Sequence, residues 1–414
     1  MQNEMQKSKG FKITAVCSLV YFASYFARKD FAAALAGMVT SGAMDKTTGG
    51  LIGTALFICY GIGQLLFGYL ADRIKPWILL VTGLALSGAT NALMPLVPST
   101  SLMIPIWAVN GFAQAMLWPP IVRMLADELE PERFVKANLY VTSAAHISTI
   151  LLYLYVPVCL TFFDWRTVFF TAGILAVSVM LIFTVCMWKT ITSKSTIRKK
   201  TAEKSDTGHT ESFISIMSRA GIWFVLIGII MMGFLRDGIE SWLPTLYAEV
   251  FERDASESVL FSAILPVFSI ISIMLATSLH KIPIFNNEAS GTLIFFIIAA
   301  TLSLPLSLLM TMDTAWARIT CLVLCALVTA SMHAVNFLYI SCLPGRFASI
   351  GRAATASGIC NACTYVGAAI STYGIAAIAE STSWSVTVIV WAVIAALGAT
   401  SSLLALPRYG KFIK

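Results

Sequence analysis

The sequence predicts an all-α membrane protein made of two bundles of six helices each. Apolar runs of about 20 residues, the length that spans a bilayer as a helix, recur along the whole chain. Of its 414 residues, 58% are hydrophobic and only 12% are charged, whereas soluble domains carry about 25% charged residues. In lipid every backbone N–H and C=O group must be satisfied within the protein, and runs of this length achieve that as helices.

Twelve spans are expected, joined by short polar connections with one exception. The exception, Thr190–Ser218, is rich in Lys, Ser and Thr, and it is expected to be a flexible cytoplasmic linker that ends in a short surface helix. It separates an amino-terminal bundle (1–189) from a carboxy-terminal bundle (219–414). The expected spans are 12–38, 49–71, 77–97, 102–125, 136–162, 166–189, 219–246, 256–280, 290–311, 315–341, 350–376 and 383–406.

The ends of the chain and its basic residues predict an orientation. No small-residue cleavage site follows the first apolar run, so this run is expected to be an uncleaved span and not a signal peptide. When both termini and the linker share one side, most of the 28 Lys and Arg residues fall on that side. Both termini are therefore expected in the cytoplasm, and the net positive charge needs no nucleic-acid partner. The opposite side receives Lys46, Arg166, Arg253 and Arg318.

Charged residues interrupt the first span in the stretch YFASYFARKDF, which ends at Phe31. Arg28, Lys29 and Asp30 lie there among apolar residues. A charge inside the membrane costs at least about 2.5 kcal/mol, so an intramembrane arginine indicates a functional site by default.

The seventh span repeats this feature, because Arg236 and Asp237 interrupt its apolar run. Arg28 lies 17 positions after Phe11, and Arg236 lies 17 positions after Arg219. If the two bundles are repeats, as in many transporters, the two arginines would lie at similar depth on either side of a pseudo-two-fold axis.

The connection after the second span reads Gly68-Tyr69-Leu70-Ala71-Asp72-Arg73. It resembles the G-x-L-A-D-R motif of the major facilitator superfamily, which implies the major facilitator fold and a motif that controls conformation without binding substrate. Gly68 is expected to allow close helix packing. Asp72 is expected to pair with a helix end or an arginine, and Arg73 to mark the cytoplasmic face.

Further motifs are spread over spans 1, 2, 4, 5, 7 and 11. Together they resemble the organophosphate:phosphate antiporter family, which includes the glycerol-3-phosphate and hexose-6-phosphate transporters. The motifs are Tyr21-x-x-x-Tyr25-x-x-Arg28-Lys29-x-Phe31, Tyr60-Gly61, Asn110-Gly111-x-x-Gln114, Trp118-Pro119-Pro120-x-x-Arg123, His146 within SAAHIS, Leu235-Arg236-x-Gly238-Ile239-x-x-Trp242-x-Pro244-Thr245 and Tyr365-Val366-Gly367.

The resemblance implies exchange of an organic phosphate for inorganic phosphate by alternating access. Arg28 and Arg236 would bind the phosphoryl group from opposite bundles, and His146 would join them. Guanidinium groups are always charged and offer a planar fork to phosphate oxygens. An empty site would keep its positive charge and reorient slowly, which would favour obligate exchange. The other implied substrate contacts are Tyr21, Tyr25, Tyr60, Tyr365, Lys29 and Gln64.

Three departures from that family concern the substrate and not the fold. Gln64 stands where the glycerol-phosphate branch has a lysine, Asp237 follows Arg236 where relatives tend to have an uncharged residue, and Ser241 takes the place of an acid. Glu240, four positions after Arg236, shares its helix face and would be able to pair with it. Asp237 and Glu240 would therefore adjust charge balance or coupling. The substrate would then be less anionic than a phosphate ester, or would carry an amine.

Some roles stay open at this point. Lys29 would either line the cavity or pair with Asp30, and His146 would be a packed polar residue, a ligand or a proton carrier. For His333 and Asn336 in the tenth span, interhelical hydrogen bonds are favoured over substrate contacts.

Two other functions fit the same pattern. One is proton- or sodium-coupled symport of a carboxylate or another organic anion, with Asp237, Glu240 and His146 in coupling. The other is a transporter-like sensor that binds a sugar phosphate and signals to a partner kinase. No enzyme activity, metal or cofactor is expected, and no G-x-x-x-x-G-K-[ST] loop for ATP is present in the sequence. A monomer in a bacterial inner membrane is expected, with a phosphate ester and inorganic phosphate as its ligands.

Overall fold

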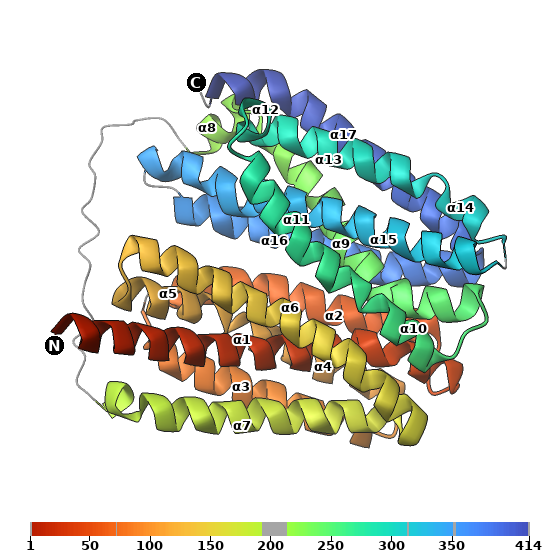
Figure 1. Ribbon diagram of the computed structural model, residues 1–414, viewed down its shortest axis with the longest axis horizontal. Coiled ribbons are helices and arrows are strands. Elements are labelled where there is room, and N and C mark those ends of the chain that lie inside the picture. The colour runs from red at the N-terminus through yellow and green to blue at the C-terminus, as the bar shows by residue number, and fades with distance from the viewer. Residues whose placement is uncertain (1, 72, 193–212, 313, 351–352, 413–414) are drawn as a thin grey trace. The chain divides into compact units, whose positions relative to one another are not determined.

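A computed structural model describes residues 2–71, 73–192, 213–312, 314–350 and 353–412. Within these ranges every regular element is a helix, as the sequence predicts (Figure 1). The helices are α1 (Gln2–Thr40), α2 (Lys46–Leu70), α3 (Pro76–Leu93), η1 (Met94–Leu96), α4 (Thr100–Ala115), α5 (Trp118–Glu128), α6 (Pro131–Phe162), α7 (Trp165–Thr192), α8 (Phe213–Arg219), α9 (Ile222–Val250), α10 (Ala255–Ser262), α11 (Ile264–Leu279), α12 (Pro283–Asn286), α13 (Glu288–Ser303), α14 (Leu306–Leu309), α15 (Ala315–Asn336), η2 (Phe337–Cys342), η3 (Leu343–Ile350), α16 (Ala353–Ser381) and α17 (Trp384–Phe412).

Eleven of the described helical segments are long and apolar enough to cross a membrane. They correspond to eleven of the twelve expected spans. The expected span 102–125 is the exception, because the structure divides it into α4 and α5. Pro119 and Pro120 lie in the first turn of α5. A proline cannot donate a helical hydrogen bond and clashes with the carbonyl four residues earlier, so the helix is interrupted just before them.

The described helices form two compact units. Unit 1 comprises Met1–Thr48, Ala55–Arg198 and Ala255–Pro266. Within it α1 packs along α6 and α7, and α3 packs along α7 and α4. Its core is apolar, and side chains such as Val20 and Phe183 are completely buried. Unit 1 thus surrounds α1, which carries the charged stretch of the first span.

Unit 2 comprises Gly49–Thr54, Lys199–Asp254 and Val267–Lys414. Within it α9 packs against α16, α17 and α15, and α13 packs against α17 and α15. Unit 2 therefore surrounds α9, which carries Arg236. These boundaries differ from the expected bundles, because α10 belongs to unit 1 and Gly49–Thr54 belongs to unit 2.

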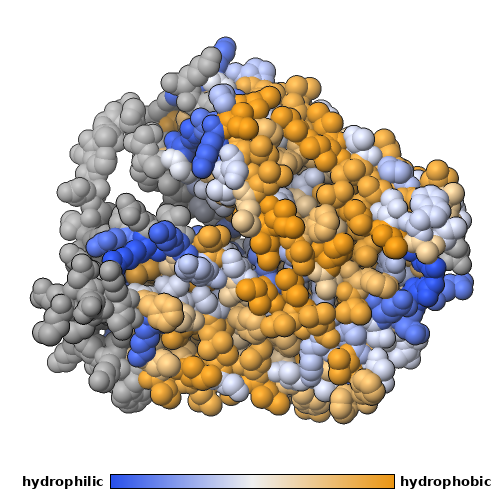
Figure 2. All heavy atoms as spheres, viewed as in Figure 1, coloured by the Kyte–Doolittle hydropathy of each residue, from blue (hydrophilic) through white to orange (hydrophobic). Residues whose placement is uncertain are grey.

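The outer faces of the helices are apolar. Hydrophobic side chains cover most of the helix surface in view, and hydrophilic ones gather near helix ends (Figure 2). Among the exposed residues are Val185 at 75%, Ile174 at 68% and Leu304 at 67%. Large apolar side chains exposed in this number are typical of surfaces that face lipid.

Candidate functional site

Arg28 lies on α1 with its guanidinium against two tyrosine rings. Its Cζ atom lies 4.2 Å from the ring centroid of Tyr25 on the same helix and 4.9 Å from that of Tyr60 on α2. Arg28 is 8% exposed and Tyr60 is 3% exposed. The face of an aromatic ring attracts a cation, by about 0.5 kcal/mol at exposed sites and about 2 kcal/mol when desolvated. These rings therefore help to fix the guanidinium inside unit 1.

The aromatic surface continues from Tyr25 to the start of α5. Tyr21 makes an edge-to-face contact with Tyr25 at 5.0 Å between ring centroids. It also packs against Trp118 at 4.8 Å. The structure thus places the predicted residues Tyr25 and Tyr60 beside Arg28, and Tyr21 against Tyr25. The sequence did not single out Trp118 as a site residue, although its Trp-Pro-Pro motif marked the helix break that positions it.

A buried polar network holds another side of α1. The Ser24 hydroxyl donates to Gln114 Oε1 at 2.6 Å. Gln114 Nε2 donates to Ser87 Oγ at 2.7 Å, and that hydroxyl donates to Asn110 Oδ1 at 2.8 Å. Asn110 Nδ2 donates in turn to the backbone carbonyl of Ala27 at 3.0 Å. Because Ala27 directly precedes the arginine, these bonds to α3 and α4 set the rotation of α1 that turns the guanidinium towards the tyrosines.

The other predicted residues of unit 1 are placed as follows. Lys29 is 9% exposed and Asp30 is completely buried. Asp30 Oδ1 accepts the backbone N–H of Phe31 at 2.8 Å. Gln64 lies on α2 and is 8% exposed. His146 lies on α6 and is half-buried.

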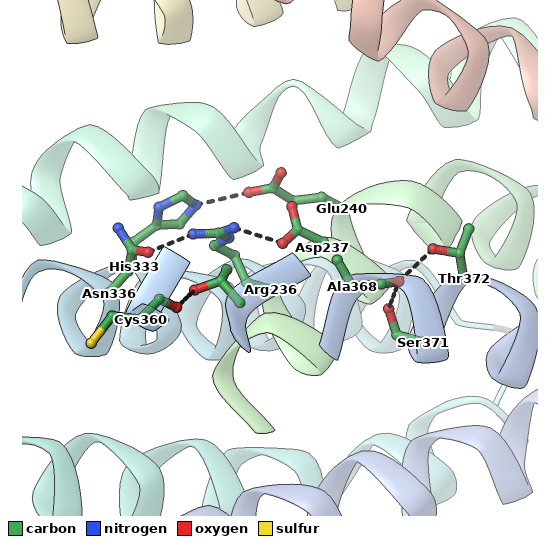
Figure 3. Close-up of polar contacts among 10 residues, drawn as sticks. Arg236, Asp237, Glu240, His333, Asn336, Cys360, Ala368, Ser371 and Thr372 are labelled. Carbon is green, nitrogen blue, oxygen red and sulfur yellow. Dashed lines mark hydrogen bonds and ion pairs between the residues drawn. The ribbon is translucent and has the colours of Figure 1, made fainter. Parts of the chain in front are cut away.

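Arg236 lies at the midpoint of α9, and oxygens on two helices hold its guanidinium (Figure 3). Nη2 lies 2.6 Å from Oδ2 of Asp237, and Nη1 donates to Oδ1 of Asn336 on α15 at 2.7 Å. The side chains of Arg236 and Asp237 are 11% and 6% exposed. This ion pair is therefore largely removed from solvent. Because it is buried, dissolved salt screens its attraction little.

Glu240 and His333 form a second pair beside the first (Figure 3). His333 Nε2 lies 2.8 Å from Glu240 Oε1, with side chains that are 10% and 15% exposed. The interhelical hydrogen bonds predicted for His333 and Asn336 are confirmed, since both join α15 to α9. The pairing expected between Glu240 and Arg236 stays a prediction. Asp237 bonds the guanidinium, and Glu240, which bonds His333, also lies within electrostatic range of Arg236.

The close packing of α9 and α16 brings Tyr365 near Arg236. A Cβ atom added to Gly367 would lie 2.0 Å from the carbonyl oxygen of Ile230, and one added to Gly233 would lie 2.1 Å from that of Thr364. Glycines at such points let helix backbones approach closely. Tyr365, on α16, is half-buried and within electrostatic range of the guanidinium.

The motif after α2 is described only in part, because Asp72 lies outside the described residues. Arg73 Cζ lies 3.5 Å from the ring centroid of Tyr69. Arg123 Nη1 on α5 donates to the carbonyls of Ala71 and Ile74, and so ties α5 to this connection. The close packing expected at Gly68 is not found among the described residues, where no atom beyond its chain neighbours and its own helix backbone lies within 4 Å of an added Cβ.

The chemistry of both units suits an anion. Guanidinium, hydroxyl and amide groups supply hydrogen-bond donors, and guanidinium recognises phosphate and carboxylate in particular. Over the described ranges, no group of three or more His, Cys, Asp or Glu residues is arranged to hold a metal ion.

Comparison with known proteins extends these observations. The family model of the Major Facilitator Superfamily matches residues 17–372, most of the chain. A solved crystal structure of a bacterial homologue of the human lysosomal transporter Spinster, inward-facing and unoccupied, aligns with a TM-score of 0.75 at 13% identity. The alignment covers 97% of this chain and 98% of that chain. Identity this low supports the fold alone.

Curated relatives are similar over shorter stretches. The glycerol-3-phosphate transporter of Bacillus subtilis (strain 168) is 28% identical over 246 residues, which are 55% of this chain and 55% of that protein. The membrane sensor protein UhpC of Salmonella typhimurium is 30% identical over 165 residues, which are 40% of this chain and 37% of that protein. The chain thus spans about half the length of the first relative and just over a third of the second.

Proposed function

Because the chain belongs to the Major Facilitator Superfamily and is a multi-pass membrane transporter, we propose that it exchanges an organic phosphate ester for inorganic phosphate by alternating access. The observation that carries this proposal is the pair of buried arginines, one in the middle of a candidate span in each unit. Arg28 is 8% exposed, and the Arg236 side chain is 11% exposed. Buried arginines in spans are costly unless they serve a ligand or a partner.

The proposed binding step uses both arginines on one phosphoryl group. A guanidinium presents parallel N–H donors to two phosphate oxygens and cannot lose its charge. In this proposal Arg28 and Arg236 approach the ligand from opposite halves. Tyr21, Tyr25, Tyr60 and Tyr365 line the route, and His146, Lys29 and Gln64 add polar contacts.

The similarity to a glycerol-3-phosphate transporter supports a phosphate ester as substrate, and it leaves the organic portion open. We further propose that 1–189 and 219–414 act as two rocking bundles, joined by the linker 190–218, in a monomer whose termini face the cytoplasm of a bacterial cell. Residues 68–73 would then control the change of conformation at the cytoplasmic side.

Counterflow in liposomes tests this function. Purified chain is reconstituted into phosphate-loaded liposomes, and uptake of labelled inorganic phosphate is followed. Arg28→Lys and Arg236→Lys keep the charge but lose the fork, and each is expected to reduce exchange by about 10- to 100-fold, the equivalent of one or two charged hydrogen bonds. Arg166→Lys is the matched control, because Arg166 is 50% exposed and pairs with Asp164 at a helix start. Its exchange should stay at the wild-type level.

A sensor is the second candidate, favoured by the similarity to UhpC. It would bind a phosphate ester with the same two arginines but would not exchange it. Ester binding by folded protein without counterflow would therefore favour the sensor. Loss of both binding and exchange in well-folded wild-type protein would contradict the phosphate function in either form.

A further inference from the structure

Asp30 lies within the membrane-spanning part of α1, and its side chain is buried inside unit 1. Its exposed fraction is 0%. Oδ1 accepts the backbone N–H of Phe31 at 2.8 Å, and Oδ2 has no hydrogen-bond partner among the described residues. Asp237, which also lies within a candidate span, has the guanidinium of Arg236 at 2.6 Å. No comparable ion pair holds Asp30 in the described ranges.

An ionised carboxylate in this position would be costly. A charge that is buried without a partner loses its hydration, and such a group in a protein takes up a proton and becomes neutral instead. The candidate membrane span around Asp30 adds to this cost. A carboxylate also offers sites for about four hydrogen bonds, of which the bond from Phe31 is described. Burial and hydrogen bonding therefore both favour the neutral acid.

A second buried acceptor without a donor lies near this turn of α1. Asn91 on α3 is completely buried, and its Nδ2 donates to the carbonyl of Ala27 at 3.0 Å. Its Oδ1 has no partner within the described part of the chain. Ala27 and Asp30 are three positions apart and share a helix face. A proton on Asp30 would thus add a donor to a region in which two buried acceptor oxygens have none.

The place of Asp30 on α1 also matters to Arg28. Two positions along a helix correspond to about 200° of rotation, so Asp30 and Arg28 lie on opposite faces of α1. An ionised Asp30 would therefore not hold the guanidinium as Asp237 does in unit 2. It would still oppose the attraction of Arg28 for an anion, because buried charges are screened little. A neutral Asp30 leaves that attraction intact.

We propose that Asp30 is a neutral carboxylic acid in the folded chain at pH 7, and that by keeping its proton it preserves the positive charge of Arg28 for the anion. The inference rests on the proposed function and deepens it, since it concerns the charge of the same site. Asp30 acts through Arg28 and does not touch the anion. The proton stays on Asp30 in the empty and in the loaded state, so it is not carried with the substrate.

The helices that pack against α1 within unit 1 are α3, α4, α5, α6, α7 and α10. The sequences of α3 and α4 contain no ionisable side chain. The ionisable residues of the other four helices are Arg123, Asp127 and Glu128 on α5, Glu132, Arg133, Lys136, Tyr140, His146, Tyr153, Tyr155 and Cys159 on α6, Arg166, Cys186 and Lys189 on α7, and Glu257 on α10. On α1 itself the nearest are Arg28 and Lys29. In the described ranges none of these groups bonds Asp30.

Infrared spectroscopy of the purified full chain shows whether Asp30 carries a proton. A protonated carboxyl group absorbs at a higher frequency than a carboxylate, and its band moves when the aspartates are labelled with carbon-13. Labelled wild type is compared with labelled Asp30→Asn at pH 7. We expect a carboxylic-acid band from labelled aspartate in wild type and its loss in the variant. Absence of this band from wild type overturns the proposal without any variant, and equal bands in the two proteins overturn it as well.

Thermal stability in detergent is the second measurement. A proton that the folded chain keeps, but that the unfolded chain loses above about pH 4, makes the fold less stable as pH rises. The unfolding equilibrium constant of wild type, relative to Asp30→Asn, should therefore increase between pH 5 and pH 7, by at most about tenfold per pH unit. Asp30→Ser, a second neutral variant, should show the same trend if Asp30→Asn does not fold.

Asp164→Asn is the matched control, because it makes the same change in unit 1 at a side chain that is 47% exposed. Its melting temperature relative to wild type should not change between pH 5 and pH 7. If the difference between wild type and Asp30→Asn is equally constant, the proposal is overturned. The same holds if sodium chloride, but not potassium chloride, stabilises wild type and leaves Asp30→Asn unchanged. A bound cation would then neutralise the carboxylate in place of a proton.

Anion binding at pH 7 connects Asp30 to Arg28. Inorganic phosphate and sulfate are titrated into wild type and Asp30→Asn. Replacing a neutral acid by an amide leaves the charge of the site unchanged, so the two affinities should agree within about threefold. Removing an ionised Asp30 would instead tighten binding by about tenfold, and a change beyond threefold in either direction overturns the proposal. If folded wild type binds neither anion, the proposed function fails, while the infrared and melting measurements still decide the protonation of Asp30.

Discussion

Arg28 and Arg236 occupy corresponding spans of the two halves of the sequence, yet their surroundings differ in kind. Two tyrosine rings contact the Arg28 guanidinium, at 4.2 and 4.9 Å. A carboxylate at 2.6 Å and an amide at 2.7 Å contact that of Arg236. A ring face attracts a cation without adding a formal charge, whereas a carboxylate cancels one. The described contacts of Arg28 thus include ring faces, whereas those of Arg236 include a carboxylate that opposes its charge.

The largest expected effect is a difference in thermal stability between variants at the two arginines. Arg236→Ala leaves Asp237 buried beside an empty space, and breaking a buried ion pair costs about 3–5 kcal/mol. Arg28→Ala removes the contacts with two rings, which are worth about 0.5–2 kcal/mol each. The apparent melting temperature in detergent should therefore fall more for Arg236→Ala.

A double variant checks the cause of that difference. In Arg236→Ala/Asp237→Ala the buried carboxylate is removed as well, so the melting temperature should recover part of the loss. If the double variant melts below Arg236→Ala, or if Arg28→Ala is the more damaging single change, the contrast between a ring-held and a carboxylate-held arginine is wrong.

The contrast also shows what a single sequence can predict. Helix positions, the two intramembrane arginines and their equal spacing follow from hydropathy and counting. The choice of Asp237 as the partner of Arg236 does not follow. Neighbouring residues point about 100° apart on a helix, so periodicity favours Glu240 at i+4. In the structure Asp237 also bonds Arg236, and Glu240 bonds His333, 93 residues further along the chain. Tertiary contacts of this kind leave no local pattern.

The polar network behind α1 was missed for the same reason. Asn110 and Gln114 appeared in a motif, but nothing in the sequence connects them to Ser24 or Ser87. Each is a small or amide side chain in an apolar run, and their bonds join three helices. By contrast, the break between α4 and α5 has a local cause, because two adjacent prolines impose it through the backbone, although one continuous span was expected there.

A smaller effect sharpens the unit 1 side of the comparison. Tyr60→Leu removes a ring face from Arg28 and should weaken phosphate affinity by about two- to thirtyfold, since a cation–π contact is worth about 0.5–2 kcal/mol. Tyr60→Phe keeps the ring and removes only the hydroxyl. Titration of both variants with phosphate separates the ring from the hydroxyl. Equal losses in the two variants would mean that the hydroxyl, and not the ring face, matters to the site.

The smallest expected effect comes from a carboxylate outside the membrane, which provides a reference for the buried Asp237. Asp45 caps α2, with its Oδ1 accepting the backbone N–H of Thr48 at 2.6 Å and its Oδ2 accepting the Thr48 hydroxyl at 2.8 Å. The bond from the Thr48 backbone is the main reason that the pKa of Asp45 lies below its usual value. A lowered pKa means that the cap stabilises the fold above the pKa of the unfolded chain and loses this effect as pH falls through the folded value.

Asp45→Ala should therefore cost about 1 kcal/mol at pH 7, the usual value of an N-cap. The cost should shrink towards pH 3, where the wild-type carboxyl takes up its proton. Asp45→Asn keeps a hydrogen-bond acceptor at the cap. Its stability should lie between those of wild type and Asp45→Ala, and the difference should not depend on pH. The measurement is the melting temperature of wild type, Asp45→Ala and Asp45→Asn at pH 7 and at pH 3. A cost that does not change with pH would show that the charge of Asp45 plays no part in the cap. Asp45 could then not serve as the exposed carboxylate with which the buried Asp237 is compared.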